Sequence, residues 1–592
     1  MLSFSEKMGY NIIINIGGGS ACRGKVEREM KVVIIGGVAG GATAAARIRR
    51  LDETVEIIVF EKSGYISYAN CGLPYYIGGI IADQEDLTLQ TPESFYSRFR
   101  VEMKVHHEVV SVNPARKTVT VKNLECGREF EESYDKLVLS PGARPIKPNF
   151  SGVDSKKIFT LRTVEDTLKI KDYINENQPK SAVVVGGGFI GLEMAENLHE
   201  LGLVVTLVEA ASQLMAPFDS DMAAFIHAEV RKHGVKLSLG TMVDGFAERN
   251  GGIEVMLKGV EPLSADMVIL AIGVAPDTAL AEMAGIELGM KKSIVVNDRM
   301  ETSIPDIYAV GDSVQIKHFI TGKDTLISLA GPANKQGRIA ADNICGGNSR
   351  YTGGQGSSII KIFDLTAAST GINERTATEL GIHTDKVILS PMSHAGYYPG
   401  GKMMTMKVLF EKGSYRLLGA QIVGFEGVDK RIDVLATAIR AGMKGIDLAE
   451  LDLAYAPPYS SAKDPVNMAG FMIENIANGV VKQWYYDDAH TLPRDGSVTL
   501  LDTRTADEYG KGHIDGFTNI PVDELRERLN EIPRDNPVYV ICQSGLRSYI
   551  AARILMGNGY DAYNFAGGFR FYDAVKNDRA FAEKATLCGM DN

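Results

Sequence analysis

Two glycine-rich segments constrain the fold of this chain more than any other feature. Gly36-Gly37-Val38-Ala39-Gly40-Gly41 and Gly186-Gly187-Gly188-Phe189-Ile190-Gly191 each follow a short apolar run and precede a helix-forming stretch. Glycines in such a turn let backbone amides and a helix N-terminus approach the pyrophosphate of a dinucleotide. A second apolar run then ends at an acidic residue, Glu61 or Glu209, which suits a ribose hydroxyl. The pattern therefore predicts an α/β fold with two Rossmann-like dinucleotide-binding domains.

The two turns differ in how well they fit the pattern G-x-G-x-x-G. The second turn fits it, whereas Val38 replaces the middle glycine of the first, so a plain strand–helix turn is the alternative there. No arginine follows Glu209 within residues 210–214 to hold a 2′-phosphate. We therefore expect NADH at the second turn, with NADPH possible.

The length and composition set further limits. A chain of 592 residues is too long for one hydrophobic core, so about three to five domains are expected. The net charge of −11 disfavours nucleic acid as a partner, and no apolar run approaches the roughly 20 residues that span a membrane. Six cysteines without paired spacing favour a reducing, cytoplasmic location. We assign no metal ligands, and we expect residues 1–29 to be a leader or a vector-derived segment.

Three later segments resemble motifs of the two-dinucleotide flavoproteins of the glutathione-reductase type. Leu137–Arg144 and Val268–Pro276 resemble the crossovers into and out of the second nucleotide domain, and Thr302–Asp312 resembles the second FAD motif. The resemblance implies FAD and NADH as cofactors, with the Asp312 carboxylate on the ribitol chain of FAD. The cofactor-binding residues that follow are Gly36, Gly37, Ala39, Gly40, Glu61, Lys62, Gly142, Asp312, Gly186, Gly188, Gly191, Glu209 and Gly273.

Cys71 lies just downstream of the first dinucleotide unit, in Ser67-Tyr68-Ala69-Asn70-Cys71-Gly72-Leu73-Pro74. Relatives that reduce small disulfides often carry Cys-x4-Cys, but Tyr76 stands at the second cysteine position here. A lone thiol beside a flavin must form a mixed disulfide with an external thiol, or become a sulfenic acid or persulfide itself. The alternative is a buried, inert cysteine.

The segment Ser67–Cys71 resembles coenzyme A-disulfide reductases, in which this cysteine forms a mixed disulfide with coenzyme A. The related NADH peroxidases and oxidases carry a histidine where this chain has Ala39, which disfavours peroxide chemistry. The residues that the resemblance implies in coenzyme A binding are Arg47, Arg50, Ser67, Asn70 and Lys463. Solvated surface charge explains the three cations equally well.

The same resemblance implies two tyrosines that approach the reactive sulfur from the partner subunit of a homodimer. Tyr397 and Tyr455 match them, and a phenol can donate a proton to a leaving thiolate. Tyr398 and Tyr459 are the alternative pair, and a purely structural role is the other alternative.

Residues 351–479 lack a nucleotide-binding loop of their own and are predicted to form an α+β dimerisation domain. We expect a mixed sheet followed by two helices. The expected strands are Ser358–Phe363, Val387–Leu389, Met404–Phe410 and Leu417–Val423, and the expected helices are Arg431–Ala441 and Asp464–Asn478.

A new α/β pattern begins near Val498, after a predicted linker at 480–496 that contains Trp484 and is expected to pack against the protein. It contains strands at Val498–Asp502 and Val538–Ile541, and an amphipathic helix is expected near Val522–Leu529. The loop Cys542-Gln543-Ser544-Gly545-Leu546-Arg547 and a helix at Ser548–Met556 follow. This pattern resembles a single rhodanese (sulfurtransferase) domain across the whole tail.

The loop from Cys542 to Arg547 has the features of a site for an anionic sulfur. Its inward-pointing amides, the helix N-terminus and the charge of Arg547 would all stabilise a thiolate or a persulfide at Cys542. Cys-x4-Arg suits sulfur, whereas phosphatase loops are one residue longer. The alternative is an inactive, protein-binding rhodanese module.

Together the segments predict an FAD domain at 30–147 and 273–350, an NAD-binding domain at 148–272, a dimerisation domain at 351–479 and a rhodanese domain at 497–592. The whole chain resembles fusions of coenzyme A-disulfide reductase with rhodanese, also described as NADH-dependent persulfide reductases. The resemblance implies FAD-dependent reduction of coenzyme A persulfide, polysulfide or coenzyme A disulfide by NAD(P)H, releasing hydrogen sulfide or thiol. The residues implied in catalysis are Cys71, Cys542, Tyr397, Tyr455 and Arg547. A plain coenzyme A-disulfide reductase and a flavoprotein redox sensor without turnover are the alternatives.

Overall fold

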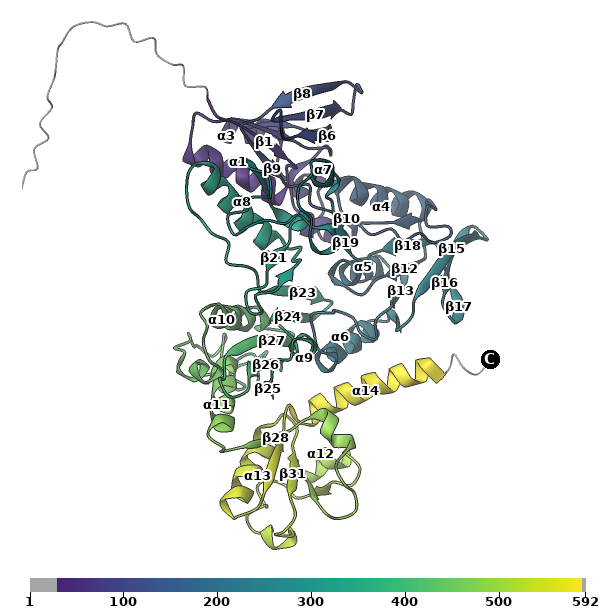
Figure 1. Ribbon diagram of the computed structural model, residues 1–592. Coiled ribbons are helices and arrows are strands. Elements are labelled where there is room, and N and C mark those ends of the chain that lie inside the picture. The colour runs from purple at the N-terminus through teal and green to yellow at the C-terminus, as the bar shows by residue number, and fades with distance from the viewer. Residues whose placement is uncertain (1–28, 588–592) are drawn as a thin grey trace, which may run out of the picture.

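The computed structural model describes residues 29–587, so the predicted leader at 1–29 falls outside the described residues except for its last position. Four units follow along the chain: the first domain (30–147 and 273–350), the second domain (148–272), the third domain (351–479) and the tail domain (480–587). Figure 1 shows the first domain at one end of the molecule and the tail domain at the other, with the second and third domains between them.

A parallel five-stranded sheet, in the order β20-β9-β1-β2-β5, forms the centre of the first domain. One face packs on the alanine-rich helix α1 (Ala39–Leu51) and on α8 (Ala330–Ile344). The other face packs on the antiparallel sheet β6-β7-β8. The strands are β1 (Lys31–Ile35), β2 (Glu56–Phe60), β5 (Glu102–Lys104), β6 (His107–Asn113), β7 (Thr118–Asn123), β8 (Glu129–Ser133), β9 (Lys136–Leu139) and β20 (Ile307–Ala309). Smaller elements are β3 (Ile66–Tyr68), α2 (Leu73–Ile77), β4 (Thr88–Gln90), α3 (Pro92–Phe99), α7 (Ala279–Met283), β21 (Ile316–Lys317) and β22 (Asp324–Thr325).

The second domain repeats this design with the sheet order β11-β18-β12-β13-β14. Helices cover one face and the antiparallel sheet β15-β16-β17 covers the other. The chain enters and leaves this domain through β10 (Ala143–Pro145) and β19 (Val274–Pro276), which pair with each other. The remaining elements are β11 (Ile158–Phe159), α4 (Val164–Asn177), β12 (Ser181–Val185), α5 (Phe189–Glu200), β13 (Val204–Glu209), α6 (Ser220–Lys232), β14 (Lys236–Leu239), β15 (Val243–Arg249), β16 (Gly252–Leu257), β17 (Val260–Ala265) and β18 (Met267–Leu270).

The third domain contains a five-stranded sheet in the order β23-β24-β27-β26-β25. All of its strand pairs are antiparallel, so the expected mixed sheet is wrong. The sequence prediction also missed β24 and α9, because β24 follows β23 through a turn of two residues and merges with it in the pattern. The elements are β23 (Ser358–Ile362), β24 (Leu365–Gly371), α9 (Glu374–Glu379), β25 (Thr384–Leu389), β26 (Thr405–Glu411), β27 (Leu417–Gly424), α10 (Val428–Arg440) and α11 (Pro465–Ala477).

The tail domain has a parallel sheet in the order β28-β32-β31-β29-β30. Its first strand, β28, lies within the predicted linker 480–496, so part of this packed segment belongs to the tail-domain sheet. The reason is Trp484, whose ring is buried and whose indole N–H donates to the Val540 carbonyl oxygen at 3.2 Å. The elements are β28 (Lys482–Trp484), β29 (Thr499–Asp502), α12 (Ala506–Gly510), β30 (Thr518–Asn519), β31 (Val538–Ile541), α13 (Leu546–Gly557), β32 (Ala562–Phe565) and α14 (Gly568–Leu587).

The amphipathic helix expected near Val522–Leu529 does not form. Amide groups in this segment bond three residues back, as from Glu524 to Pro521 and from Arg528 to Leu525, so the chain makes successive turns. Val522 and Leu525 are buried at this spacing, which is why the apolar pattern imitates a helix. Only the short 3₁₀ turn Leu529–Glu531 follows.

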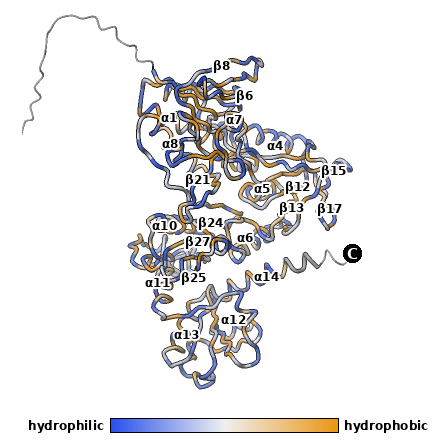
Figure 2. Tube along the Cα trace, viewed as in Figure 1, coloured by the Kyte–Doolittle hydropathy of each residue, from blue (hydrophilic) through white to orange (hydrophobic). Residues whose placement is uncertain are grey.

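Polar contacts and packed helices hold the domains to one another. The buried ammonium of Lys407 in the third domain pairs with Asp219 and Asp221 of the second domain and with Glu374. The tail domain contacts the third domain through the Tyr485 hydroxyl, which donates to Asp385 at 2.7 Å, and its helix α14 lies along α6 (Figure 1). Figure 2 shows hydrophobic segments distributed over all four domains, and no helix among residues 29–587 has the length and apolar character needed to cross a membrane.

Candidate active sites

The segment that carries Cys71 is tied to the first glycine-rich turn. The Ser67 amide donates to the Gly37 carbonyl oxygen at 2.9 Å. Ser67 has a φ of 44°, in the left-handed region that non-glycine residues adopt only where their surroundings hold them. A 3₁₀ turn, Asn70–Gly72, then carries Cys71 into α2. The structure thus brings Ser67, Asn70 and Cys71 together beside the first turn.

Several charged groups from other segments surround the Cys71 thiol. Much of the residue is exposed in the single chain, yet enough protein lies around the sulfur that burial, followed by the Glu193 carboxylate, raises the pKa of the thiol. Arg162 acts in the opposite direction. Its guanidinium donates to Asp312 at 2.7 Å, which places the predicted FAD-binding aspartate in the same cluster.

Tyr75 and Glu193 form a second hydrogen-bonded pair near the sulfur. Burial raises the pKa of Glu193 to about 7, and burial together with nearby carboxylates raises the pKa of Tyr75 to about 12. Sequence reasoning missed Arg162, Glu193 and Tyr75 as neighbours of Cys71. Arg162 and Glu193 come from the second domain, far from Cys71 in sequence, and no local sequence pattern predicts that they lie near it.

The first turn has the shape that a dinucleotide pyrophosphate requires. Gly36 has a φ of 99°, and a Cβ there would lie 2.1 Å from the Ser140 carbonyl oxygen, so only glycine fits. The Gly37 amide donates to the Glu61 carboxylate at 2.8 Å. Lys62 points elsewhere, because its ammonium is exposed and lies 3.4 Å from the Asp277 carboxylate. The turn, Glu61 and Asp312 fit a dinucleotide, and the placement of Lys62 gives it no part in the turn.

The second turn has the same construction. The Gly187 amide donates to Glu209 at 2.6 Å, and the other oxygen of Glu209 accepts from the Ala211 amide at 2.7 Å. A Cβ at Gly188 would meet no atom within 4 Å, which leaves open space before the N-terminus of α5. This space and the free helix N-terminus suit a pyrophosphate. Gly186, Gly191 and Gly273 adjoin the same turn: Gly191 packs against the Gly186 carbonyl, and Gly273 follows β18.

Gly142 and Ala39 complete the predicted cofactor residues of the first domain. A Cβ at Gly142 would lie 3.4 Å from the Arg162 guanidinium, so this glycine adjoins the Arg162–Asp312 pair. Ala39 begins α1 and Gly40 follows it, packed against Ser140 and Val310.

Tyr397 and Tyr455 meet on the surface of the third domain. Their hydroxyl oxygens are 2.8 Å apart, while 76% of Tyr397 and 46% of Tyr455 are exposed. The hydrogen bond between the two hydroxyls raises the pKa of Tyr455. Tyr398 and Tyr459, the alternative pair, are exposed as well, but it is Tyr397 and Tyr455 that bond to each other.

A buried arginine, Arg431, joins the two loops that carry these tyrosines. Its guanidinium donates to the Ser393 carbonyl oxygen at 2.9 Å, to the Tyr459 carbonyl oxygen at 3.3 Å and to the Asp464 carboxylate at 3.0 Å. The side chain is only 1% exposed. Sequence reasoning missed this residue, which lies inside a helix pattern without any motif of its own.

The expected coenzyme A cations lie in two separate parts of the chain. Arg47 and Arg50 project from α1, and Arg47 already bonds to the Asp342 carboxylate at 2.7 Å. Lys463 is exposed just before α11, in the third domain. Figure 1 shows α1 and α11 well apart in the single chain, so these cations do not form one site within it.

The second candidate cysteine, Cys542, accepts hydrogen bonds from its own loop and from the first turn of α13. It is fully buried at the end of β31. Its Sγ accepts from the Gly545 amide at 3.1 Å and from the Ser548 hydroxyl at 3.2 Å. Gly545 has a φ of 100°, which turns its N–H inward. The loop therefore supplies the inward-directed donors that the sequence predicts.

Arg547 differs from its expected role as a free charge beside Cys542. Its guanidinium forms a two-point ion pair with the Glu508 carboxylate at 2.7 and 2.8 Å. This pairing lowers the pKa of Glu508 to about 2. The partner is 39 residues away in sequence, so the loop pattern alone could not reveal that the charge is compensated.

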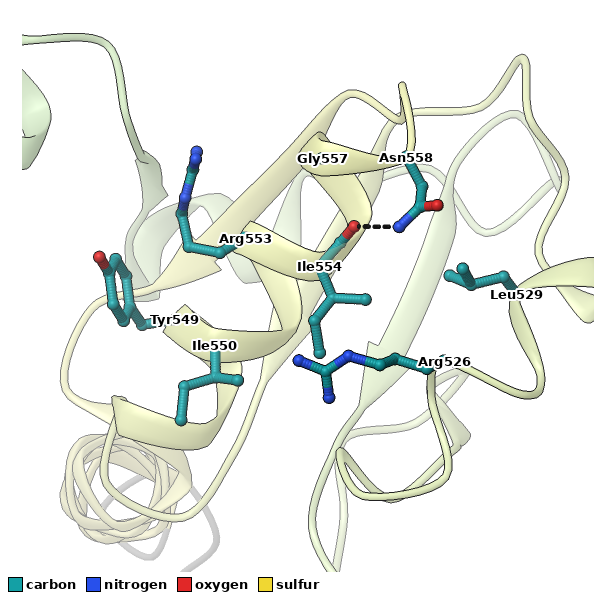
Figure 3. Close-up of a pocket in the computed structure, with 8 residues that line it drawn as sticks. All are labelled: Arg526, Leu529, Tyr549, Ile550, Arg553, Ile554, Gly557 and Asn558. Carbon is teal, nitrogen blue, oxygen red and sulfur yellow. Dashed lines mark hydrogen bonds between the residues drawn. The ribbon is translucent and has the colours of Figure 1, made fainter.

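A shallow pocket of about 500 Å³ lies along α13, the helix that follows the Cys542 loop. Figure 3 shows Tyr549, Ile550, Arg553 and Ile554 along that helix, with Arg526 facing them from the segment before β31. The pocket combines two guanidinium groups with apolar side chains.

Family models match almost the whole described chain. The model for pyridine nucleotide-disulphide oxidoreductases matches residues 30–337, its dimerisation domain matches 357–465, and a rhodanese-like domain matches 486–574. The third match begins inside the predicted linker, two residues after the end of β28.

Individual relatives cover the chain to different extents. A coenzyme A disulfide reductase of Staphylococcus aureus (strain JH9) is 39% identical over 442 residues, which are 74% of this chain and 99% of the relative. The structure of reduced CoADR-RHD from Bacillus anthracis is 48% identical, with a TM-score of 0.91, and covers 93% of this chain and 99% of its own. An NAD-dependent persulfide reductase from A. fulgidus is 38% identical, with a TM-score of 0.86, and covers 92% of this chain and 100% of its own. The two dinucleotide turns thus stand in one chain with the family's dimerisation domain and with a rhodanese-like domain that carries Cys542. The chain is a member of the pyridine nucleotide-disulphide oxidoreductase family, whose members are flavoprotein enzymes that use FAD and NAD(P)H.

Proposed function

We propose that the chain reduces coenzyme A persulfide, with electrons from NADH, and that its tail domain supplies sulfane sulfur from polysulfide or another persulfide donor. The observation that carries this proposal is the pair of unlike cysteines. Cys71 is exposed beside the first dinucleotide turn, and Cys542 is buried among donors that suit a sulfur anion. Coenzyme A disulfide would be reduced at the same site.

The residues present fit both cofactors of the family. The first turn, Glu61 and Asp312 would hold FAD, and the second turn with Glu209 would hold NADH. When bound, FAD supplies a two-electron path from NADH to a disulfide at Cys71. NADH is favoured over NADPH because Glu209 already accepts two backbone N–H groups and would repel a 2′-phosphate.

The proposed chemistry at Cys71 proceeds in two balanced steps. The Cys71 thiolate attacks the inner sulfur of coenzyme A persulfide, forms a mixed disulfide and releases hydrogen sulfide after protonation. Two electrons then break the mixed disulfide, giving coenzyme A thiol and the Cys71 thiolate. In sum, one persulfide, one NADH and one proton give one coenzyme A thiol, one hydrogen sulfide and one NAD⁺.

The tyrosine pair would supply the proton in this scheme. Tyr397 and Tyr455 are exposed on the third domain, with their hydroxyls bonded to each other. In a homodimer formed through this domain, the pair would face Cys71 of the partner subunit. A phenol beside the sulfur can protonate a leaving thiolate. A reducing, cytoplasmic location suits a free thiol at Cys71.

The runner-up function is a plain coenzyme A-disulfide reductase. The Staphylococcus aureus relative favours it, since this chain matches 99% of that protein. That match, however, spans only 74% of this chain, so it leaves the Cys542 loop unexplained. A redox sensor without turnover is disfavoured by the same loop, where the Cys542 sulfur accepts two hydrogen bonds that suit a sulfur anion.

The two functions separate in a steady-state assay of the flavin-loaded dimer. Turnover would be measured with coenzyme A persulfide and with coenzyme A disulfide, following both NADH oxidation and sulfide release. A larger kcat/KM for the persulfide is expected. A clear preference for the disulfide would favour the runner-up, and absence of sustained NADH oxidation with either would overturn both.

A further inference from the structure

The C-terminal helix α14 of the tail domain lies against α6 of the second domain (Figure 1). Phe571 packs against Phe225 with ring centroids 6.1 Å apart, and the Arg231 guanidinium lies 4.7 Å from the Phe581 ring centroid. Between these contacts, the Asp578 carboxylate reaches both Arg231 and His227. The contact between α14 and α6 therefore combines apolar packing with one carboxylate, that of Asp578, which has two partners on α6.

The tautomer of His227 follows from its hydrogen bonds. The Leu214 amide donates to Nε2 at 3.0 Å, so Nε2 carries no proton. Nδ1 therefore carries the proton and donates to Asp578 Oδ2 at 2.8 Å. The imidazole is only 1% exposed, which makes it a buried link between the tail domain and the Leu214 backbone.

The Leu214 backbone belongs to the wall of the second dinucleotide turn. The next amide, that of Met215, donates to the Gly187 carbonyl oxygen at 2.9 Å. A Cβ at Gly187 would lie only 2.4 Å from a methyl group of Leu214. Met215 has a φ of 53° and is fully buried, so this conformation persists only because its neighbours hold it.

Asp578 is well suited to anchor this chain of bonds. Burial alone would raise its pKa, but the hydrogen bonds from His227 and Arg231 and the charge of Arg231 lower it below the usual value. The group is thus a carboxylate that accepts two charge-assisted or polarised hydrogen bonds. The sequence separation from His227 is 351 residues, which is why no motif pointed to the pair.

We propose that Asp578 is a positioning residue for the pyridine nucleotide: through His227 it holds Leu214 and Met215 against Gly187, so that docking of α14 tightens nucleotide binding at the second turn. The inference rests on the proposed function, which assigns NADH to this turn. Because coupling between two sites is reciprocal, bound nucleotide must also strengthen the docking of α14.

The test compares Asp578→Ala and Asp578→Asn with a matched control in the full-length, flavin-loaded protein. Asp573→Asn makes the same chemical change on an exposed position of α14, where the carboxylate bonds only to Asn577 within that helix among the described contacts. The dissociation constant for NAD⁺ would be measured by calorimetry, and amide exchange would be followed in residues 210–218. We expect Asp578→Ala to weaken NAD⁺ binding about fivefold and to expose the Leu214 and Met215 amides, with smaller effects in Asp578→Asn and none in Asp573→Asn.

Kinetics separate a positioning role from a structural one. The KM for NADH should rise in Asp578→Ala with little change in kcat, and NAD⁺ should slow amide exchange in α14 of the wild type. Asp578→Glu, which keeps the carboxylate, should recover part of the affinity.

An unchanged dissociation constant in both Asp578→Ala and Asp578→Asn would overturn the inference, as would equal losses in Asp573→Asn. Should Asp578→Ala not fold, Asp578→Asn decides alone. Absence of NAD⁺ binding by the wild type would instead defeat the proposed function of the second turn.

Discussion

The two candidate cysteines, Cys71 and Cys542, lie in opposite kinds of surroundings. Cys71 is exposed, and its charged neighbours Arg162 and Glu193 come from another domain. Cys542 is fully buried, and both donors to its sulfur come from within six residues of it. The donors to the tail sulfur therefore come from one loop and the first turn of α13. The site at Cys71 instead depends on several domains and, in the proposed function, on a cofactor and a partner subunit.

This contrast suggests a division of labour between the two sulfurs. A buried thiol that accepts hydrogen bonds from its own loop can carry an added sulfur atom as an anion without groups from other domains. An exposed thiol beside a dinucleotide turn can accept a bulky thiol from solution and receive electrons there. The following four changes test whether the two sites are as independent as their surroundings indicate.

The largest effect is expected from Cys542→Ser, which removes the sulfur acceptor of the tail. Sulfur transfer from polysulfide should fall at least about 1,000-fold, because no other group in the loop is a thiol. Reduction of coenzyme A disulfide by the same variant should stay at the wild-type rate. Cys345→Ser provides the control, and loss of both reactions in Cys542→Ser would show that the sites are not independent.

Tyr455→Phe is expected to act on the Cys71 site alone. Removing a proton donor beside the leaving sulfur should lower kcat for coenzyme A persulfide roughly 100-fold, with sulfur transfer at Cys542 unaffected. Tyr459→Phe, four residues further along the same loop, tests the alternative assignment. Equal kcat values for Tyr455→Phe and the wild type would remove the pair from the mechanism.

Ser548→Ala removes one of the two donors to the Cys542 sulfur. The hydroxyl lies 3.2 Å from Sγ in a buried site, and loss of a hydrogen bond costs about 0.5–1.5 kcal/mol. Sulfur transfer should therefore slow by about tenfold, a smaller effect than loss of the cysteine itself. The Gly545 amide remains as the second donor. Alkylation of Cys542 at one fixed pH would show whether the sulfur has become less reactive.

Glu193→Gln should give the smallest effect, at Cys71. Burial raises the pKa of Glu193 to about 7, so above that pH its negative charge opposes a thiolate at Cys71 and below it the charge is lost. The variant should lower the pKa of Cys71 and speed its alkylation by iodoacetamide about threefold above pH 7, with little change at pH 6. Glu200→Gln, exposed on the same helix, is the control. Identical pH profiles in Glu193→Gln and the wild type would mean that Glu193 does not act on the sulfur.

The sequence predicted the local parts of this molecule well and its long-range contacts poorly. The strand–turn–helix form of both glycine-rich segments agrees with the sequence pattern, and so do the strand-end positions of Glu61 and Glu209. The strand–loop–helix setting of Cys542 agrees as well, because each of these features depends on neighbours in sequence. The pairing of Arg547 with Glu508 could not be predicted, since a loop motif does not reveal which distant carboxylate folds onto it.

Two errors in the tail domain have a related cause. The segment near Val522–Leu529 buries residues at a spacing that helices and successive turns share, so its apolar pattern did not distinguish them. Residues 480–496 looked like a linker because β28 is only three residues long. Its partner strand β32 lies far along the chain, and only the burial of Trp484 shows where β28 belongs.

The division of labour is tested most directly by mass spectrometry of the two cysteine-containing peptides. The purified protein would be treated with coenzyme A persulfide, and in parallel with polysulfide, without NADH and under non-reducing conditions. We predict a coenzyme A adduct on Cys71 in the first sample and one added sulfur atom on Cys542 in the second. Coenzyme A attached to Cys542, or an unmodified Cys71, would contradict the assignment of the two sulfurs.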